Sequence, residues 1–66
     1  MEIKYPHIKV RLVGQDGNAF AIIGRVTKAM RRAKVSLQEI NQFQAEAMSG
    51  DYNHLLSVVM SYVEVE

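Results

Sequence analysis

The chain has 66 residues, 48% of them hydrophobic, a formal net charge of +1 and no cysteine. These values favour one small globular domain over residues 1–66 and exclude disulfide bonds and thiolate metal sites. The longest clean apolar stretch, 19–23, is too short to span a membrane, and the first residues do not resemble a signal peptide. We therefore expect a cytoplasmic protein that does not associate with membranes.

Charge is divided unevenly between the two halves of the chain. All eight Lys and Arg residues lie within 1–34, where Glu2 and Asp16 reduce the net charge to +6, whereas residues 35–66 carry −5. Such asymmetry is typical of an anion-binding surface or of two halves that attract each other.

Residues 7–13 alternate between polar and apolar side chains, which predicts a half-buried strand that starts after Pro6. A turn follows, in which Gly17 supplies backbone freedom and Asp16 or Asn18 caps the next helix. The spacing Gly14-x-x-Gly17 is similar to the loop of KH RNA-binding domains. However, Asp16 would place a negative charge beside the phosphates, so a turn with a helix cap is the preferred interpretation.

Residues 18–33 are predicted to form an amphipathic helix. Residues placed at intervals of 100° give it one apolar face, made of Phe20, Ile23, Val26, Met30 and Ala33. The other side carries a basic stripe, which consists of Arg25, Lys28, Arg31 and Arg32.

A second helix is predicted to start at Ser36 with a capping box, in which Ser36 accepts from the N–H of Glu39 and the Glu39 side chain reaches back. We expect it to end at Gly50 in the left-handed conformation. Its inward side chains are Leu37, Ile40, Phe43 and Ala47.

Asp51 is predicted to cap a third helix. Strict alternation fails within 55–62, so a helix is preferred there over a strand. The apolar face of this helix comprises Tyr52, Leu55, Leu56, Val59, Met60 and Val63.

The last four residues alternate again and indicate a short strand beside residues 8–12. That pairing would bring Glu64 and Glu66 near Lys9 and Arg11. The expected fold class is therefore α+β, with one N-terminal strand, three amphipathic helices and a short C-terminal strand that pairs with the first.

The basic stripe is the best candidate for a functional surface. Cations at this spacing could follow the phosphates of a nucleic acid, but a solvated helix face is the preferred interpretation because no aromatic side chain for base stacking accompanies them. Gly24 also stands out, since glycine inside a helix costs about 1 kcal/mol relative to alanine. Close approach by another part of the chain or by a partner would explain it.

The pattern contains no catalytic constellation. Asp51 and His54 lack a nucleophile and an orienting group, and they are too few to bind a metal. We therefore expect no enzyme activity, no metal and no cofactor.

Several segments of the sequence resemble those of a group of short uncharacterised proteins from bacteria and phages. They are Leu12-Val13-Gly14-x-Asp16-Gly17-Asn18-Ala19-Phe20, Arg31-Arg32-Ala33, Val35-Ser36 and Ser49-Gly50-Asp51-Tyr52-x-His54-Leu55-Leu56. The resemblance implies a complete small protein and brings no activity. Members of that group tend to carry an acid where Asn53 stands, and this difference further weakens a metal or acid–base role for residues 51–54.

The leading functional hypothesis is a non-catalytic protein-interaction or binding module that self-associates. A two-stranded sheet is barely stable alone and a chain of this length has a small core, so we expect a homodimer formed by strand addition or by the apolar surface of the third helix. The alternative is a weak nucleic-acid-binding protein that uses the basic stripe. Another protein is a further possible partner.

Overall fold

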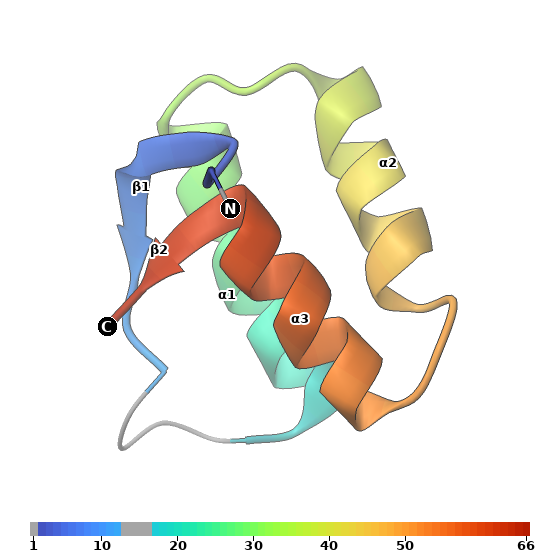
Figure 1. Cartoon of the computed structure of the whole chain (residues 1–66). Coiled ribbons are helices and arrows are strands. Elements are labelled where there is room, and N and C mark those ends of the chain that lie inside the picture. Colours follow the sequence, from blue (N-terminus) through green and yellow to red (C-terminus); the bar gives the residue numbers. More distant parts are fainter. Residues whose placement is uncertain (1, 13–16) are drawn as a thin grey trace.

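The protein has an α+β fold in which a strand from each end of the chain forms a small sheet against three helices (Figure 1). The structure is a computed structural model that describes residues 2–12 and 17–66. The elements are β1 (Tyr5–Val10), α1 (Ala19–Arg32), α2 (Leu37–Ala47), α3 (Tyr52–Tyr62) and β2 (Val63–Val65). The expected order of strand, three helices and strand is confirmed.

The two strands run parallel, with Lys9 opposite Glu64 and Val10 opposite Val65. The pairing is irregular between Tyr5 and Lys9. Pro6 lies in that interval, and because proline has no N–H, it suits an irregular part of a strand. The strand therefore starts before Pro6, whereas the sequence predicted a start after Pro6. Val13, the last residue of the predicted strand, lies outside the described residues.

The expected neighbours across the sheet are also present. Glu64 is directly opposite Lys9. The backbone of Glu66 donates to the Val10 carbonyl at 2.8 Å and accepts from the Leu12 N–H at 3.1 Å, so it brackets Arg11. The acidic end of the chain thus lies beside the segment that carries Lys9 and Arg11.

Helix α1 begins as the sequence indicates, since the Asn18 side chain accepts from the Phe20 N–H at 2.9 Å. The alternative cap, Asp16, and the first part of the predicted turn lie outside the described residues. The buried face is displaced from the predicted one, because Phe20 is 75% exposed and Ala33 is exposed after the helix end. Phe20 lies about 120° around the helix from the buried Val26. The buried side chains are Ile22, Ile23, Val26, Thr27 and Met30.

The end of α1 has the hydrogen bonds of a Schellman motif. The N–H of Lys34 donates to Arg31 O and the N–H of Val35 donates to Met30 O, each at 3.0 Å. Lys34 occupies the left-handed position with φ of 65°. This turn directs the chain into α2.

Helix α2 starts at the predicted cap, where Ser36 accepts from the Glu39 N–H at 3.3 Å. Ile40, Phe43 and Ala47 are buried as expected. Leu37 is 62% exposed, so its predicted inward position is wrong. At the first position of the helix it lies beyond the edge of the core.

The end of α2 differs from the prediction for Gly50. The helix closes at Met48, whose N–H donates to the Gln44 and Glu46 carbonyls, and Gly50 does not take the left-handed conformation. A Cβ at Gly50 would instead lie 2.7 Å from Cγ of His54. Glycine is therefore explained here by the close approach of His54.

Helix α3 confirms the helical interpretation of residues 55–62, and Asp51 caps it by accepting from the His54 N–H at 2.9 Å. Its buried face is rotated from the predicted one. Tyr52 and Met60 are about half exposed, and Val58 and Tyr62 are buried in their place. The helix leads directly into β2, where Val63 is fully buried.

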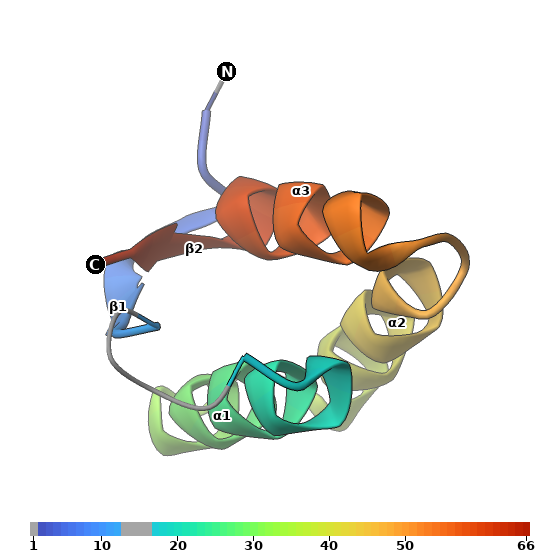
Figure 2. The ribbon, with the colours of Figure 1, turned by 90° about the horizontal axis from the view of Figure 1, so that it is seen from below.

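The core lies between two layers, with α1 on one side and α3 with the sheet on the other, while α2 closes one end (Figure 2). Phe43 of α2 is fully buried and meets Tyr62 of α3 with ring centroids 5.2 Å apart. No helix in the described part of the chain is both long enough and apolar enough to cross a membrane.

Candidate anion-binding groove

A groove runs between α1 and β1 with a volume of about 310 Å³. We call it the basic groove. Three members of the predicted basic stripe line it, together with Lys9 of β1 and Arg11, the residue after β1. Its full lining is Lys9, Val10, Arg11, Arg25, Lys28, Ala29 and Arg32.

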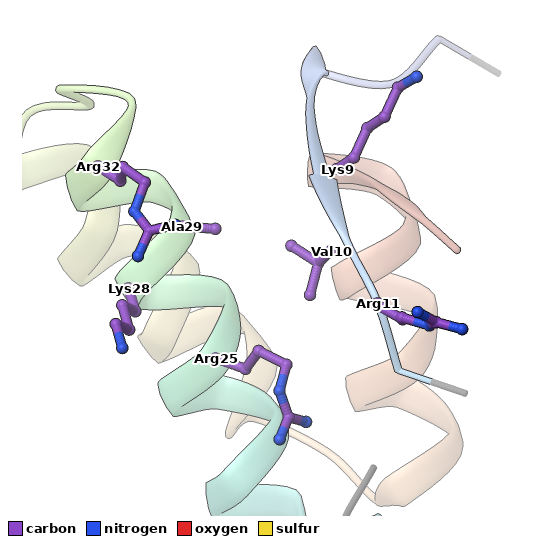
Figure 3. A pocket seen from close by; sticks show the side chains of 7 residues that line it. All are labelled: Lys9, Val10, Arg11, Arg25, Lys28, Ala29 and Arg32. Carbon is purple, nitrogen blue, oxygen red and sulfur yellow. The ribbon is translucent and has the colours of Figure 1, made fainter. Parts of the chain in front are cut away.

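The side chains of the basic groove have distinct orientations (Figure 3). Val10 points toward α1 and Ala29 points toward β1, so the two form an apolar floor. Arg25 reaches from α1 toward the strand, whereas Lys9 and Arg11 leave β1 on the side away from α1. This arrangement follows from the alternation of a strand, in which neighbouring residues point to opposite faces.

The basic groove is strongly positive. None of its lining residues is acidic. Within the described parts of the chain, Lys9, Arg11, Lys28 and Arg32 have no carboxylate at ion-pair distance. Glu64 of β2 and Glu66, the residue after it, lie beside the segment that carries Lys9 and Arg11, so Lys28 and Arg32 contribute most of the uncompensated charge.

The groove continues along the strand toward His7. A second hollow of about 230 Å³ shares Lys9, Ala29 and Arg32 with it and adds His7, Ile8 and Ala33. Together the two hollows follow β1 over residues 7–11, which corresponds to a length of about 13 Å for an extended chain. A linear ligand along this length would meet the cationic side chains of α1, because Lys9 and Arg11 point away from that helix.

Two residues of the predicted site, Arg31 and Gly24, do not line the basic groove. Arg31 is exposed but does not line the basic groove. Gly24 is exposed on the outer side of α1, and a Cβ there would meet no atom within 4 Å. Intramolecular close packing is therefore wrong as an explanation for this glycine in the described structure.

His54 lies beside a serine, but the geometry is that of a helix cap. Its Nε2 is 3.0 Å from both Ser49 Oγ and the Glu46 carbonyl oxygen, and Ser49 Oγ also donates to that carbonyl at 2.7 Å. Because a carbonyl oxygen only accepts, the tautomer with a proton on Nε2 satisfies these contacts, and that nitrogen is then no base for Ser49. The cluster closes the C-terminal end of α2, whose last turn has no basic residue.

Only half of the predicted capping box forms: among the described residues the Glu39 side chain does not reach back to the start of α2 but contacts the N-terminal segment instead. Its Oε2 accepts from the Tyr5 hydroxyl at 2.8 Å and lies 2.7 Å from Lys4 Nζ. These contacts join the N-terminal segment to α2, and we call them the N-terminal clasp. The Lys4 ammonium lies over the ring of Tyr62, 5.3 Å from its centroid, which extends the contact to α3.

The N-terminal clasp shifts the ionisation of its members. The hydrogen bond from Lys4, with a second from Tyr5, holds the pKa of the Glu39 carboxyl below its ordinary value. The same hydrogen bond raises the pKa of Lys4, while burial and then the bond to Glu39 raise the pKa of Tyr5. The ion pair is therefore favoured near neutral pH.

Among residues 2–12 and 17–66, no three His, Asp or Glu side chains come together as a metal site. Comparisons of the chain with protein-family models, with curated proteins and with solved structures gave no match.

Sequence reasoning found the helix side of the basic groove and missed the strand side. The stripe follows directly from helical periodicity. Lys9 and Arg11 join it only because β1 packs beside α1, which is a tertiary contact. The strand alternation had marked both residues as outward-facing, and this was the available signal.

Proposed function

We propose that the chain is a non-catalytic binding module that holds the phosphate backbone of a nucleic acid along the basic groove. The observation that carries the proposal is a row of three cations, Arg25, Lys28 and Arg32, on one wall of a groove without acidic lining. Backbone phosphates present negative charges in a row, and their neutralisation supplies essentially all of sequence-independent affinity. Lys9 and Arg11 add positive charge at the strand side.

The groove suits backbone contacts better than base recognition. None of its seven lining residues is aromatic, and stacking on aromatic rings is how proteins hold exposed bases. We therefore expect weak binding, with a Kd near the range of about 10⁻⁴ to 10⁻⁶ M that is typical of non-specific complexes. Sequences of different composition should bind alike.

A salt titration of binding to a labelled DNA duplex tests the proposal. If the three helix cations each neutralise one phosphate, the logarithm of the affinity should fall with the logarithm of the salt concentration with a slope of about −2.7. That slope corresponds to about a 40-fold loss of affinity between roughly 50 and 200 mM salt. Fluorescence anisotropy measures it directly.

The matched variants are Arg32→Gln and Arg31→Gln, which remove the same charge from adjacent positions. Only Arg32 lines the groove. Arg32→Gln should reduce the slope by about 1, and Arg31→Gln should leave it almost unchanged. Absence of binding at low salt, or equal effects of the two substitutions, would contradict the proposal.

A further inference from the structure

Strand β1 and the residues after it have one edge that faces away from β2. The Glu66 N–H donates to the Val10 carbonyl at 2.8 Å, and the Leu12 N–H donates to the Glu66 carbonyl at 3.1 Å. The backbone groups of alternate residues in a strand point to opposite edges, so those of Lys9 and Arg11 point away from β2. Within the described ranges, β1 pairs with β2 alone. We call the second edge the free edge of β1, and such an edge can pair with another extended chain.

The free edge of β1 borders the basic groove. Figure 2 shows β1 between β2 and α1, so the edge that points away from β2 lies on the side of α1. Residues 9–11 line the groove from the strand side, and α1 lines it from the other side. The basic groove and the hollow that continues it follow residues 7–11. This length accepts about four residues of an added strand, at about 3.3 Å per residue.

The two faces of an added strand would have different surroundings. Lys9 and Arg11 are exposed and leave β1 on the side away from α1. Acidic side chains on that face of an added strand would lie beside these two cations, and cross-strand pairs of opposite charge are stabilising. On the other face, Val10 and Ala29 form the apolar floor of the groove, which favours apolar side chains. The free edge therefore suits a segment in which acidic and apolar residues alternate.

The opposite edge of β1 already pairs with a segment of this kind. Residues 63–66 read Val-Glu-Val-Glu. In the pairing with β1, Glu64 is exposed opposite Lys9, while Val63 is buried in the core. A strand presents the same side chains beside both of its edges, because its two faces extend across the whole sheet. The pairing with β2 is thus a guide to the sequence that the free edge accepts.

We infer that the free edge of β1 binds an extended segment of a partner protein in which acidic and apolar residues alternate. Its backbone pairs with Lys9 and Arg11, and its apolar side chains enter the basic groove over Val10 and Ala29. Strand addition of this type takes its affinity from main-chain hydrogen bonds and its specificity from alternate side chains. The corresponding acidic strand of a second copy is already paired with its own β1, so a separate protein is the occupant.

This inference goes beyond the proposed function and does not depend on it. The partner segment binds through backbone hydrogen bonds at a strand edge, whereas a nucleic acid binds through its phosphates. The two ligands exclude each other, because both occupy the space between α1 and β1.

Fluorescence anisotropy with a labelled Val-Glu-Val-Glu-Val-Glu peptide tests the inference. One control peptide has the same composition in blocks, Val-Val-Val-Glu-Glu-Glu, and therefore the same charge without the alternation. A second control has the alternating sequence with N-methyl groups on alternate backbone nitrogens, which removes the donors of one edge. The alternating peptide should bind saturably, and each control should bind about tenfold more weakly.

The matched protein variants are Arg11→Gln and Arg11→Pro, which remove the same charge. Only proline also removes the N–H at the free edge, and proline is tolerated there because the N–H of Leu12, not that of Arg11, bonds to Glu66. Arg11→Pro should bind the alternating peptide about fivefold more weakly than Arg11→Gln, as expected for one hydrogen bond. Circular dichroism checks that both variants are folded.

The peptide controls decide the question even if Arg11→Pro does not fold. The inference is overturned if the alternating peptide does not bind. It is also overturned if both control peptides bind as tightly as the alternating one, since charge attraction alone would then explain the binding. Neither result affects the salt titration with DNA, so the failure of this inference and the failure of the proposed function can be told apart.

Discussion

At position 34 a lysine adopts the backbone conformation that glycine usually supplies. Its φ of 65° closes the Schellman motif at the end of α1, where the hydrogen bonds to Arg31 and Met30 hold it. The left-handed conformation costs an L-residue with a Cβ roughly 1–2 kcal/mol. The rest of the turn must compensate for that cost.

We therefore expect Lys34→Gly to stabilise the protein by about 1 kcal/mol, because glycine takes this conformation without the Cβ penalty. Urea unfolding measures the change. Lys34→Ala separates conformation from charge, since it removes the ammonium but keeps the Cβ, and it should give little gain. Equal stabilities of the two variants would show that the backbone at Lys34 is not strained.

Single residues at helix starts were predicted well from the sequence. Asn18, Ser36 and Asp51 cap α1, α2 and α3 because a cap is satisfied by groups within three residues along the chain. Gly50 was assigned the wrong role, since its requirement comes from the ring of His54 rather than from the local backbone. The sequence was enough to predict hydrogen bonds between residues close together in the chain, but not contacts between turns and helices.

At the level of elements, the N-terminal clasp holds the start of β1 and the residue before it against α2. Glu39 takes part in it through an oxygen that meets both Lys4 and Tyr5. The clasp depends on an ionised carboxyl, so it links the attachment of this segment to pH.

The pKa of the Glu39 carboxyl is lower in the folded than in the unfolded chain. Such a carboxyl stabilises the fold fully above its ordinary pKa, here 4.5. This stabilisation is lost as the pH falls through the pKa of the folded state. We expect the stability of the protein to decrease below pH 4.5. Glu39→Gln should be less stable near neutral pH and should show a smaller decrease in acid. Urea unfolding at pH values on both sides of 4.5 measures this.

Tyr5→Phe is the companion variant, because it removes the hydroxyl that donates to Glu39 and keeps the ion pair with Lys4. The decrease of its stability in acid should lie between that of the unsubstituted protein and that of Glu39→Gln. An unchanged acid dependence in Glu39→Gln would assign the effect to other carboxyl groups.

The periodicity of each element predicted its type but not the direction of its buried face. Phe20, Leu37, Tyr52 and Met60 were all assigned to inward faces and are 45% exposed or more. Each lies at an edge of its apolar face or near a helix end. Where that edge meets the core depends on the angle between helices, which the sequence of one helix does not contain.

At the level of the whole molecule, one aromatic contact lies at the centre of the core. Phe43 has no exposed surface and packs edge-on against Tyr62, the last residue of α3 before β2. Every helix contributes to this core, but α2 has only three buried side chains: Ile40, Phe43 and Ala47. Phe43 is therefore the main attachment of α2.

We expect Phe43→Ala to cost about 3–5 kcal/mol, the usual range for a buried phenylalanine. The core of a chain this small rarely supplies more than about 3–5 kcal/mol, so the variant should be largely unfolded at room temperature. Thermal unfolding followed by circular dichroism checks this. Phe43→Leu fills most of the volume and should remain folded, and a stable Phe43→Ala would mean that α2 is held by other contacts.

The parallel pairing of β1 with β2 also determines when the fold can close. Strand β1 leaves the ribosome well before its hydrogen-bonding partner, Val63–Val65, which is made more than fifty residues later. Helices form through contacts between neighbouring residues, so they can form before distant parts of the chain are made. During synthesis, Ile8 and Val10 therefore stay without their final cover until β2 emerges, and the growing chain depends on its helices to shield them.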